Sequence, residues 1–399
     1  MTGSYLYNDT MSSNTSLSFG DSSLNMTDAS SIQAKNDILR YTECQSIFKA
    51  CLAQRYLFLI IGPILIVMST VGNSLGIAVM RHKSLKNTAT SVFIIALAVS
   101  DTVAVWTGLS RHFVYKLTEY DIRQYSVWAC RFQRFFLYVA LDTSPWILAA
   151  VTVERFLAVC MPQLHPAIKT APRAWLIVLG IVVFQLGFNS HVFFNYGKQI
   201  ITGDNQTEVF SCGFSSPAAR KYIVIYQGYI LLALYCVIPF IIMLTLNILI
   251  IKRLHKVKKS FEHRNMSIKS QRRQTRSHSL TKMLLTVTFY FILVSTPNFI
   301  YTLIQSKLLD TKNFTAQEYA QTEIIDAVCT LLLYLNHTLN FFLYCVSGRR
   351  FRKQLTSMLK CGAGTTKRGS VTYMPSQSDN HKSFELPSME KQGTKGDAI

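Results

Sequence analysis

Seven long apolar stretches dominate the sequence and constrain its fold more than any other feature. Each reaches or exceeds the ~20 residues that a helix needs to cross the ~30 Å hydrocarbon core of a bilayer. Because lipid offers no partner for exposed backbone groups, an open chain can cross it only as helices. The sequence therefore predicts an all-α membrane protein, with a seven-helix transmembrane bundle in residues 56–347. The stretches are 56–80, 91–115, 127–160, 173–195, 222–253, 279–307 and 321–346.

The composition agrees with a chain that is partly solvated by lipid. Of the 399 residues, 49% are hydrophobic and 16% are charged, against about 25% charged in a typical soluble chain. The net charge of +20 would suit nucleic acid, but the sequence contains no motif of a nucleic-acid-binding module. Its Lys and Arg residues fall in short segments between the apolar stretches, which is the pattern of the positive-inside rule. We therefore expect membrane lipids, and no nucleic acid, as partners.

The distribution of basic residues also predicts the orientation of the bundle. Lys and Arg crowd the segments that follow the first, third, fifth and seventh stretches, and these segments would face the cytoplasm. The N-terminus would then lie outside and the C-terminus inside, in a multi-pass protein of the plasma membrane. Residues 1–55 would form a glycosylated extracellular segment, in which Cys44 and Cys51 either form a disulfide or stay free. Its N-x-S/T acceptor sites are Asn8, Asn14 and Asn25.

A short basic segment, residues 348–361, follows the seventh stretch. Phe351, Leu355 and Leu359 recur there every four residues, so a helix would present an apolar stripe to the cytoplasmic leaflet. Cys361 is a candidate palmitoylation site, the alternative being an unmodified cysteine. Residues 362–399 are rich in Gly, Ser, Thr and Lys, a composition that predicts a disordered cytoplasmic tail.

Polar residues inside the stretches narrow the class of protein, because such residues are costly in lipid and usually have a function. In order along the chain they are Gly72-Asn73, Leu97-Ala-Val-Ser-Asp101, Glu154-Arg155-Phe156, Trp175, Pro239, Pro297 and Asn336-His-Thr-Leu-Asn340-Phe-Phe-Leu-Tyr344. This set resembles the rhodopsin-like (class A) G-protein-coupled receptors over about residues 56–361. Within that class, Val151–Cys160 and Asn340–Gly348 look most like neuropeptide receptors of the FMRFamide and myoinhibitory-peptide (sex-peptide) type.

The resemblance implies a receptor that activates heterotrimeric G proteins, with arrestin and receptor kinases as further partners. It implies that Glu154 holds Arg155 at rest and that Arg155 reaches the G protein when the helices part. The alternative is a surface ion pair at a helix end, which would contribute little to stability. The other switch residues that the resemblance implies are Phe291, Pro297, Asn340 and Tyr344.

The resemblance also implies an allosteric sodium ion beside Asp101, in the middle of the second stretch. Hard cations prefer oxygen ligands, and Ser144, Asn336 and Asn340 would complete the set; no other cofactor is expected. The alternative is that Asp101 is a structural hydrogen-bond acceptor. The family pattern is incomplete elsewhere: Phe341 stands where a proline usually follows Asn340, and the sixth stretch lacks the usual tryptophan before its proline.

Two features bear on the outer face and the ligand. Cys130 and Cys212 lie on the oxidising side, and the resemblance implies a disulfide between them. Leu137 stands where amine receptors carry an aspartate, which argues against a monoamine ligand. Charges of both signs near the outer ends favour a peptide, although these residues could also pair only with one another. The candidate pocket residues are Arg111, His112, Arg134, Leu137, Glu323 and Asp326.

Other classes of function fit the sequence less well. A receptor for a non-peptide small molecule is the nearest alternative. Transporters tend to show related halves with broken helices, and this sequence shows no internal repeat. An enzyme is not expected, because the chain contains no P-loop, no H-E-x-x-H and no G-x-S-x-G motif.

Overall fold

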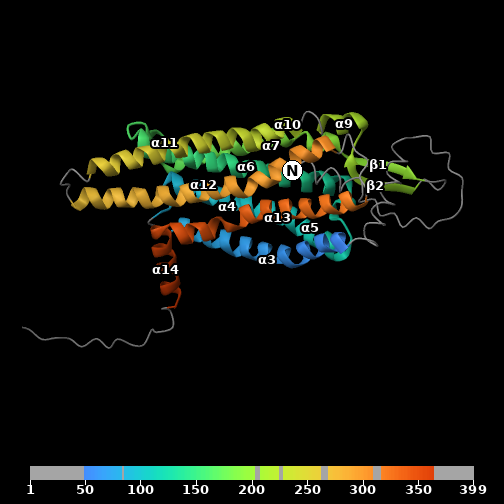
Figure 1. Ribbon diagram of the computed structural model, residues 1–399, viewed down its shortest axis with the longest axis horizontal. Coiled ribbons are helices and arrows are strands. Elements are labelled where there is room, and N and C mark those ends of the chain that lie inside the picture. Colours follow the sequence, from blue (N-terminus) through green and yellow to red (C-terminus); the bar gives the residue numbers. More distant parts are fainter. Residues whose placement is uncertain are drawn as a thin grey trace, which may run out of the picture. The chain divides into compact units, whose positions relative to one another are not determined.

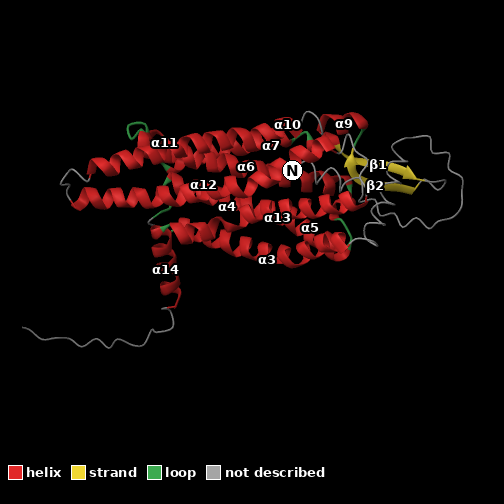
Figure 2. Ribbon diagram, viewed as in Figure 1, coloured by secondary structure: helices red, strands yellow, loops and turns green. Residues whose placement is uncertain are grey.

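The computed structural model describes residues 49–82, 85–202, 207–223, 228–261, 268–308 and 316–363. Within these ranges seven helices are long and apolar enough to cross a membrane, as the sequence predicts. Figure 1 shows them running alongside one another, and Figure 2 shows that helix is their main secondary structure. The candidate spans are Leu52–Met80, Ala89–Thr118, Val127–Cys160, Ala171–Asn195, Ala233–Val257, Thr281–Tyr301 and Gln321–Ser347.

Several spans are built from more than one helical element. The second joins α4 (Ala89–Ala104) and α5 (Ser110–Thr118) through a π-helical segment, Val105–Leu109. The fifth contains a second π-helical segment, Leu232–Val237. The first helix begins at Lys49 rather than at residue 56. The remaining helices are α3 (Lys49–Met80), α6 (Val127–Cys160), α7 (Ala171–Asn189), α8 (Val192–Asn195), α9 (Pro217–Lys221), α10 (Gly228–Leu231), α11 (Ile238–Phe261), α12 (Ile268–Leu308), α13 (Ala316–Ser347) and α14 (Arg349–Ala363).

Local sequence signals explain where two of the central helices begin. The Oγ1 of Thr88 accepts a hydrogen bond from the backbone N of Ser91 at 3.2 Å, which caps α4. The Oγ of Ser126 accepts from the backbone N of Ala129 at 3.1 Å, which caps α6. Such side chains satisfy amide groups that have no partner inside the first helical turn. Both helices therefore start at residues whose side chains favour a helix N-terminus.

The burial of each helix identifies its place in the bundle. In the most apolar 18-residue segment of α6, 78% is buried inside the protein. In the most apolar segment of the fourth span, which is formed mainly by α7, only 22% is buried. The exposed residues of α7 include Leu176, Leu179 and Phe184, which suit contact with lipid. α6 is thus the central helix, and residues along it can reach sites at both ends of the bundle.

A β-hairpin lies between the fourth and fifth spans. Strand β1 (Tyr196–Thr202) pairs antiparallel with β2 (Thr207–Phe214), with Tyr196 opposite Phe214. The register shifts between Tyr196 and Lys198, where Gly197 adopts a φ of 90° that glycine accommodates without strain. The hairpin thereby brings Cys212 back to the start of α6.

The chain divides into two units, one that ends at Met358 and one that begins at Leu359. In the first unit, the beginning of α14 packs against α13: the ring of Phe351 lies 5.6 Å from that of Phe341 and 5.6 Å from that of Tyr344. Phe351 is buried, and Leu355 packs against the same core. A helix therefore follows the seventh span as predicted, but Phe351 and Leu355 pack against the bundle core, and contact of the stripe with the cytoplasmic leaflet stays a prediction.

Some sequence expectations concern residues outside the described ranges. These are the glycosylation sites Asn8, Asn14 and Asn25, the cysteine Cys44 and the tail from residue 364. Cys361 lies within α14, but its side chain is outside the described part. Those expectations remain predictions from the sequence.

Candidate functional site

An ion pair lies near the inner end of the central helix α6. Nε of Arg155 donates to Oε2 of Glu154 at 2.6 Å, and its Nη2 donates to Oε1 at 2.9 Å. Glu154 and Arg155 are 2% and 8% exposed. The predicted pairing is present, and it is buried rather than superficial. Because this ion pair is bidentate, it fixes the relative orientation of the guanidinium and the carboxylate as well as holding them together.

Two further side chains complete an inner cluster of Thr90, Glu154, Arg155 and His165. Nη2 of Arg155 donates to Oγ1 of Thr90 on α4, and this hydroxyl also lies 3.4 Å from Oε2 of Glu154. His165, in the loop after α6, places Nε2 3.1 Å from Oε1 of Glu154. All four residues line a cavity of about 400 Å³ that also contacts Met283 of α12. Thr90 and His165 were not predicted, because their contacts with the ion pair are made across different elements.

The middle of the bundle holds a second cluster of four residues, which we call the central cluster: Asp101, Ser144, His337 and Asn340. Oδ1 of Asp101 accepts from Oγ of Ser144 at 2.5 Å and from Nδ1 of His337 at 2.7 Å. Its Oδ2 accepts from Nδ2 of Asn340 at 2.7 Å. The cluster joins α4, α6 and α13, and Asp101 is fully buried.

The central cluster differs from the predicted sodium site. Asn336, one of the four expected ligands, instead donates from Nδ2 to Oγ of Ser295 on α12 at 3.3 Å, and His337 stands in its place. The imidazole of His337 lies against Oδ1 of Asp101 and offers no oxygen, whereas a hard cation prefers oxygen ligands. The arrangement therefore does not fit the sodium ion expected from the sequence. The sequence signal for His337 was its position in a span, next to Asn336.

The other predicted switch residues occupy different environments. Phe291 and Tyr344 are buried in the apolar core around the inner half of the bundle. Pro297 lies within α12, which remains helical through it, and its side chain is exposed. Phe341, at the position where the family has a proline, packs its Cβ against Gly72 of α3. A ring in place of the proline thus fills the contact between α3 and α13.

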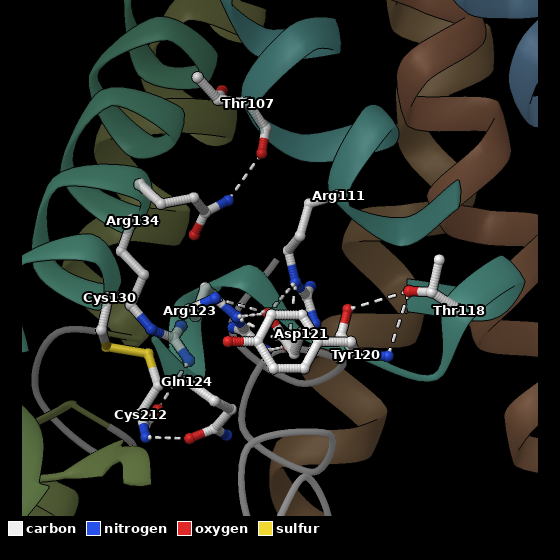
Figure 3. Close-up of polar contacts among 11 residues, drawn as sticks. Thr107, Arg111, Thr118, Tyr120, Asp121, Arg123, Gln124, Cys130, Arg134 and Cys212 are labelled. Atoms are coloured by element: carbon white, nitrogen blue, oxygen red, sulfur yellow. Dashed lines mark hydrogen bonds and ion pairs between the residues drawn. A yellow bond between two sulfur atoms is a disulfide. The ribbon is translucent and has the colours of Figure 1, made fainter. Parts of the chain in front are cut away.

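The predicted disulfide is present at the outer end. It joins Cys130, near the start of α6, to Cys212 of β2 (Figure 3). The backbone N of Cys212 also donates to Oε1 of Gln124 at 3.1 Å, and its carbonyl accepts from Nη2 of Arg134 at 3.3 Å. The base of the hairpin is therefore fixed by a covalent bond and by two hydrogen bonds.

A buried triad, Arg111, Asp121 and Arg123, organises the first outer loop. As Figure 3 shows, both guanidinium groups converge on the carboxylate of Asp121, with distances to Oδ2 of 2.8 Å from Arg111 and 2.7 Å from Arg123. Burial alone would raise the pKa of Asp121, but the two arginines outweigh it and hold that pKa well below its usual range. We call this set the loop triad. Neither Asp121 nor Arg123 was among the candidate site residues predicted from the sequence.

The structure assigns partners to several predicted pocket residues. Arg111 pairs with Asp121 in the loop triad, and its place in a ligand pocket stays a prediction. The guanidinium of Arg134 lies 4.3 Å from the centre of the Tyr196 ring. His112 stacks on Phe58 of α3 at 5.0 Å. Each of these three side chains thus has a contact within the protein, made by the outer loops or by a neighbouring helix.

The acidic residues of α13 lie near a second group of charges. Oε2 of Glu323 accepts from Nε2 of Gln54 on α3 at 2.7 Å, and Oε1 of Gln54 accepts from Nζ of Lys116 on α5 at 2.7 Å. Asp326, one turn further along α13, is also buried. Leu137 lies deeper, where it packs close to Gly108. The outer ends of three helices thus meet around charged groups of both signs.

One more buried carboxylate lies between α6 and α7. Oδ2 of Asp142 accepts from Nδ2 of Asn189 at 2.9 Å, and its backbone carbonyl accepts from Nε2 of Gln185 at 3.4 Å. These contacts make Asp142 a hydrogen-bond acceptor at a helix interface. Within the described residues, no group of three or more His, Cys, Asp or Glu side chains is arranged to hold a metal ion.

A bundle of seven spanning helices, a disulfide-anchored outer hairpin and a buried Glu–Arg pair at the inner end define a seven-transmembrane receptor. The family model described as "7 transmembrane receptor (rhodopsin family)" matches residues 72–344. The chain belongs to this family, and it is a receptor rather than an enzyme.

Similar proteins cover most of the chain at low identity. The chain is 25% identical over 347 residues to the type-1 angiotensin II receptor of Bos taurus, across 82% of this chain and 89% of that receptor. It is 26% identical over 314 residues to the type-1 angiotensin II receptor B of Xenopus laevis, across 76% and 80%. It is 22% identical over 320 residues to a putative G-protein coupled receptor of Caenorhabditis elegans, across 75% and 72%.

Proposed function

We propose that the chain is a plasma-membrane receptor that binds an extracellular peptide and, in response, activates heterotrimeric G proteins. The observation that carries this proposal is the buried inner cluster, in which Glu154 and Thr90 hold the guanidinium of Arg155. Such a cluster has two discrete arrangements, closed and open, so a ligand that favours one of them shifts the population. Family membership supplies the partner, since receptors of this class act on G proteins.

The contacts of Arg155 specify what activation must change. Its partners come from α4 and from its neighbour in α6, and His165 of the following loop holds the same carboxylate. A movement that separates α6 from α4 breaks the bond to Thr90 and frees one side of the guanidinium. The adjoining cavity of about 400 Å³ then offers a place where a segment of the G protein meets Arg155. The closed cluster corresponds to the resting receptor.

The outer charges support a peptide as the ligand. Glu323 and Asp326 of α13 offer negative charge to a basic side chain or an amino terminus. Lys116 adds positive charge close by, and the disulfide holds the base of the hairpin at the same outer end as the loop triad. A ligand with several separated polar groups matches such a surface better than a small apolar molecule does. The relatives named for angiotensin II, a peptide, and the resemblance to FMRFamide and myoinhibitory-peptide receptors favour a neuropeptide.

A ligand screen tests this proposal. Cells that express the chain are exposed to a library of synthetic neuropeptides, amidated and non-amidated, with calcium and cyclic-AMP readouts. We expect at least one peptide to give a saturable response that disappears in Arg155→Ala at equal surface expression. If no peptide or basal signal appears, and Arg155→Ala changes nothing, the proposed function is wrong. A response to small molecules alone would support the assignment as a receptor and contradict the assignment of a peptide ligand.

A pair of variants then tests the site. For an active peptide with a basic residue, Glu323→Gln should raise the half-maximal concentration about tenfold or more, because a charge-assisted hydrogen bond contributes roughly 1.5–3 kcal/mol. Glu119→Gln is the matched control, since Glu119 is an exposed outer carboxylate paired with Arg55. Equal effects of the two variants would argue against a specific contact at Glu323.

A further inference from the structure

His337 changes what the central cluster can bind. Its side chain is 1% exposed, and its Nδ1 lies 2.7 Å from Oδ1 of Asp101. Because a carboxylate only accepts hydrogen bonds, Nδ1 carries the hydrogen and donates it. The imidazole therefore lies directly against the carboxylate oxygen at which a cation would have to bind.

The remaining contacts of Asp101 are donors as well. Its Oδ1 also accepts from Oγ of Ser144 at 2.5 Å, and its Oδ2 accepts from Nδ2 of Asn340 at 2.7 Å. Both carboxylate oxygens of Asp101 are thus engaged in short hydrogen bonds. The hydroxyl of Ser144 keeps oxygen lone pairs for a cation while it donates, whereas the imidazole of His337 offers no oxygen. A sodium ion would therefore have to displace the ring to reach Oδ1 of Asp101.

The residues around His337 hold it in this position. Its backbone carbonyl accepts from Nδ2 of Asn73 on α3 at 3.4 Å, and Asn73 also donates to Oγ of Ser69 at 3.1 Å. The adjacent residue, Asn336, donates to Ser295 on α12. α13 is therefore tied to α3 and α12 at this level, which positions the backbone from which the imidazole reaches Asp101.

We propose that the imidazole of His337 takes the place of a sodium ion beside Asp101, so that the ligand-free receptor has no specific sodium site there. The connection between α4 and α13 is then a direct hydrogen bond between side chains. It follows that α13 moves relative to α4 without the release of an ion. His337 is thus the hydrogen-bond partner that the chain itself supplies to the carboxylate of Asp101.

Thermal unfolding of the purified full-length receptor in detergent tests this inference, with sodium chloride and choline chloride at equal ionic strength as the probes. The wild-type protein is expected to unfold at the same temperature in both salts. His337→Ser removes the ring and leaves a hydroxyl oxygen, so its unfolding temperature should be higher in sodium chloride. The control is His112→Ser, which removes a buried imidazole that stacks on Phe58 at the outer end; it should show no sodium-specific shift.

Sodium-specific stabilisation of the wild-type protein would overturn the inference. An unchanged response of His337→Ser would also overturn it, because the ring would then not be what excludes the ion. If His337→Ser does not fold, His337→Asn is measured in the same salts with the same expectation, since its amide retains a donor and adds an oxygen. Adding Asp101→Asn to the responsive variant should abolish the shift. The measurement uses neither ligand nor G protein, so its outcome is independent of the proposed function.

Discussion

Replacing Asp121 by Asn would remove the carboxylate that two buried arginines share. Arg111 and Arg123 are 3% and 1% exposed, and their Nη2 atoms lie 2.8 Å and 2.7 Å from Oδ2 of Asp121. Asparagine preserves the size of the side chain but not its charge. The variant would therefore leave two guanidinium groups buried at close range with a neutral amide between them.

The expected cost follows from the burial of the triad. Breaking a buried ion pair by removing one partner costs about 3–5 kcal/mol, because the other charge stays buried and uncompensated. In a protein domain of this size, each kcal/mol lowers the unfolding temperature by roughly 2–4 °C. Asp121→Asn should therefore lower the unfolding temperature by about 6–20 °C. The change lies in the first outer loop, so surface expression should fall as well.

Thermal unfolding of the detergent-solubilised receptor, followed by the loss of monodisperse protein after heating, measures this effect. Glu119→Gln is the matched control, because Glu119 and Arg55 form a pair whose side chains are 67% and 37% exposed. Exposed pairs contribute about 0–1 kcal/mol, so the control should unfold close to the wild-type temperature. If Asp121→Asn also unfolds close to the wild-type temperature, or if both variants lower the unfolding temperature equally, the argument from burial is refuted.

The contribution of Asp121 should depend on pH in a definite direction. Burial alone raises its pKa, but Arg111 and Arg123 hold the pKa well below the usual range. A carboxyl group with a lowered folded-state pKa stabilises the protein above the unfolded pKa of about 3.9, and this stabilisation is lost as pH falls through the folded value. The difference between wild type and Asp121→Asn should therefore be constant from neutral pH to about pH 5 and shrink below about pH 4. A difference that already shrinks near neutral pH would contradict this assignment.

Two further variants test the packing and the inner cluster. Gly108→Ala should destabilise the receptor by about 1–3 kcal/mol, because a Cβ there would overlap the side chain of Tyr334. The control in the same thermal assay is Gly180→Ala, where a Cβ meets no atom within 4 Å. This control should not destabilise the receptor, because alanine favours a helix more than glycine does. Thr90→Val should raise ligand-free nucleotide exchange on the G protein about tenfold or more, since it removes a charge-assisted hydrogen bond of roughly 1.5–3 kcal/mol to Arg155. If the rate of nucleotide exchange is the same in Thr90→Val as in the wild-type receptor, Thr90 does not help to restrain Arg155.

The spans were predictable because membrane thickness sets their length. The third was placed at 127–160, where α6 runs from Val127 to Cys160. The pairing of Glu154 with Arg155 was expected from the resemblance to class A receptors, because neighbouring residues on a helix do not face each other and adjacency alone would not predict it. The start of α3 was less predictable, since a helix can extend beyond the hydrocarbon core without any change in apolar content.

Contacts between distant parts of the chain could not be read from the sequence. His337 and Asp101 are separated by 236 positions, and helical periodicity alone does not identify which of Asn336 and His337 faces the carboxylate. Both lie close to Asn340 on α13, at spacings of four and three residues, so both share a helix face with it. For Arg111, the pairing with Asp121 depends on the path of the outer loop, which carries no periodic signal.

The central claim is that Glu154 restrains Arg155 in the resting receptor and that the freed Arg155 activates the G protein. It is tested most directly by nucleotide exchange on purified heterotrimeric G proteins with ligand-free receptor in nanodiscs. Glu154→Gln should exchange nucleotide faster than the wild-type receptor, and the double variant Glu154→Gln/Arg155→Ala should return to the rate of the G protein alone. If Glu154→Gln leaves the rate unchanged, or if the double variant stays elevated, the claim is contradicted.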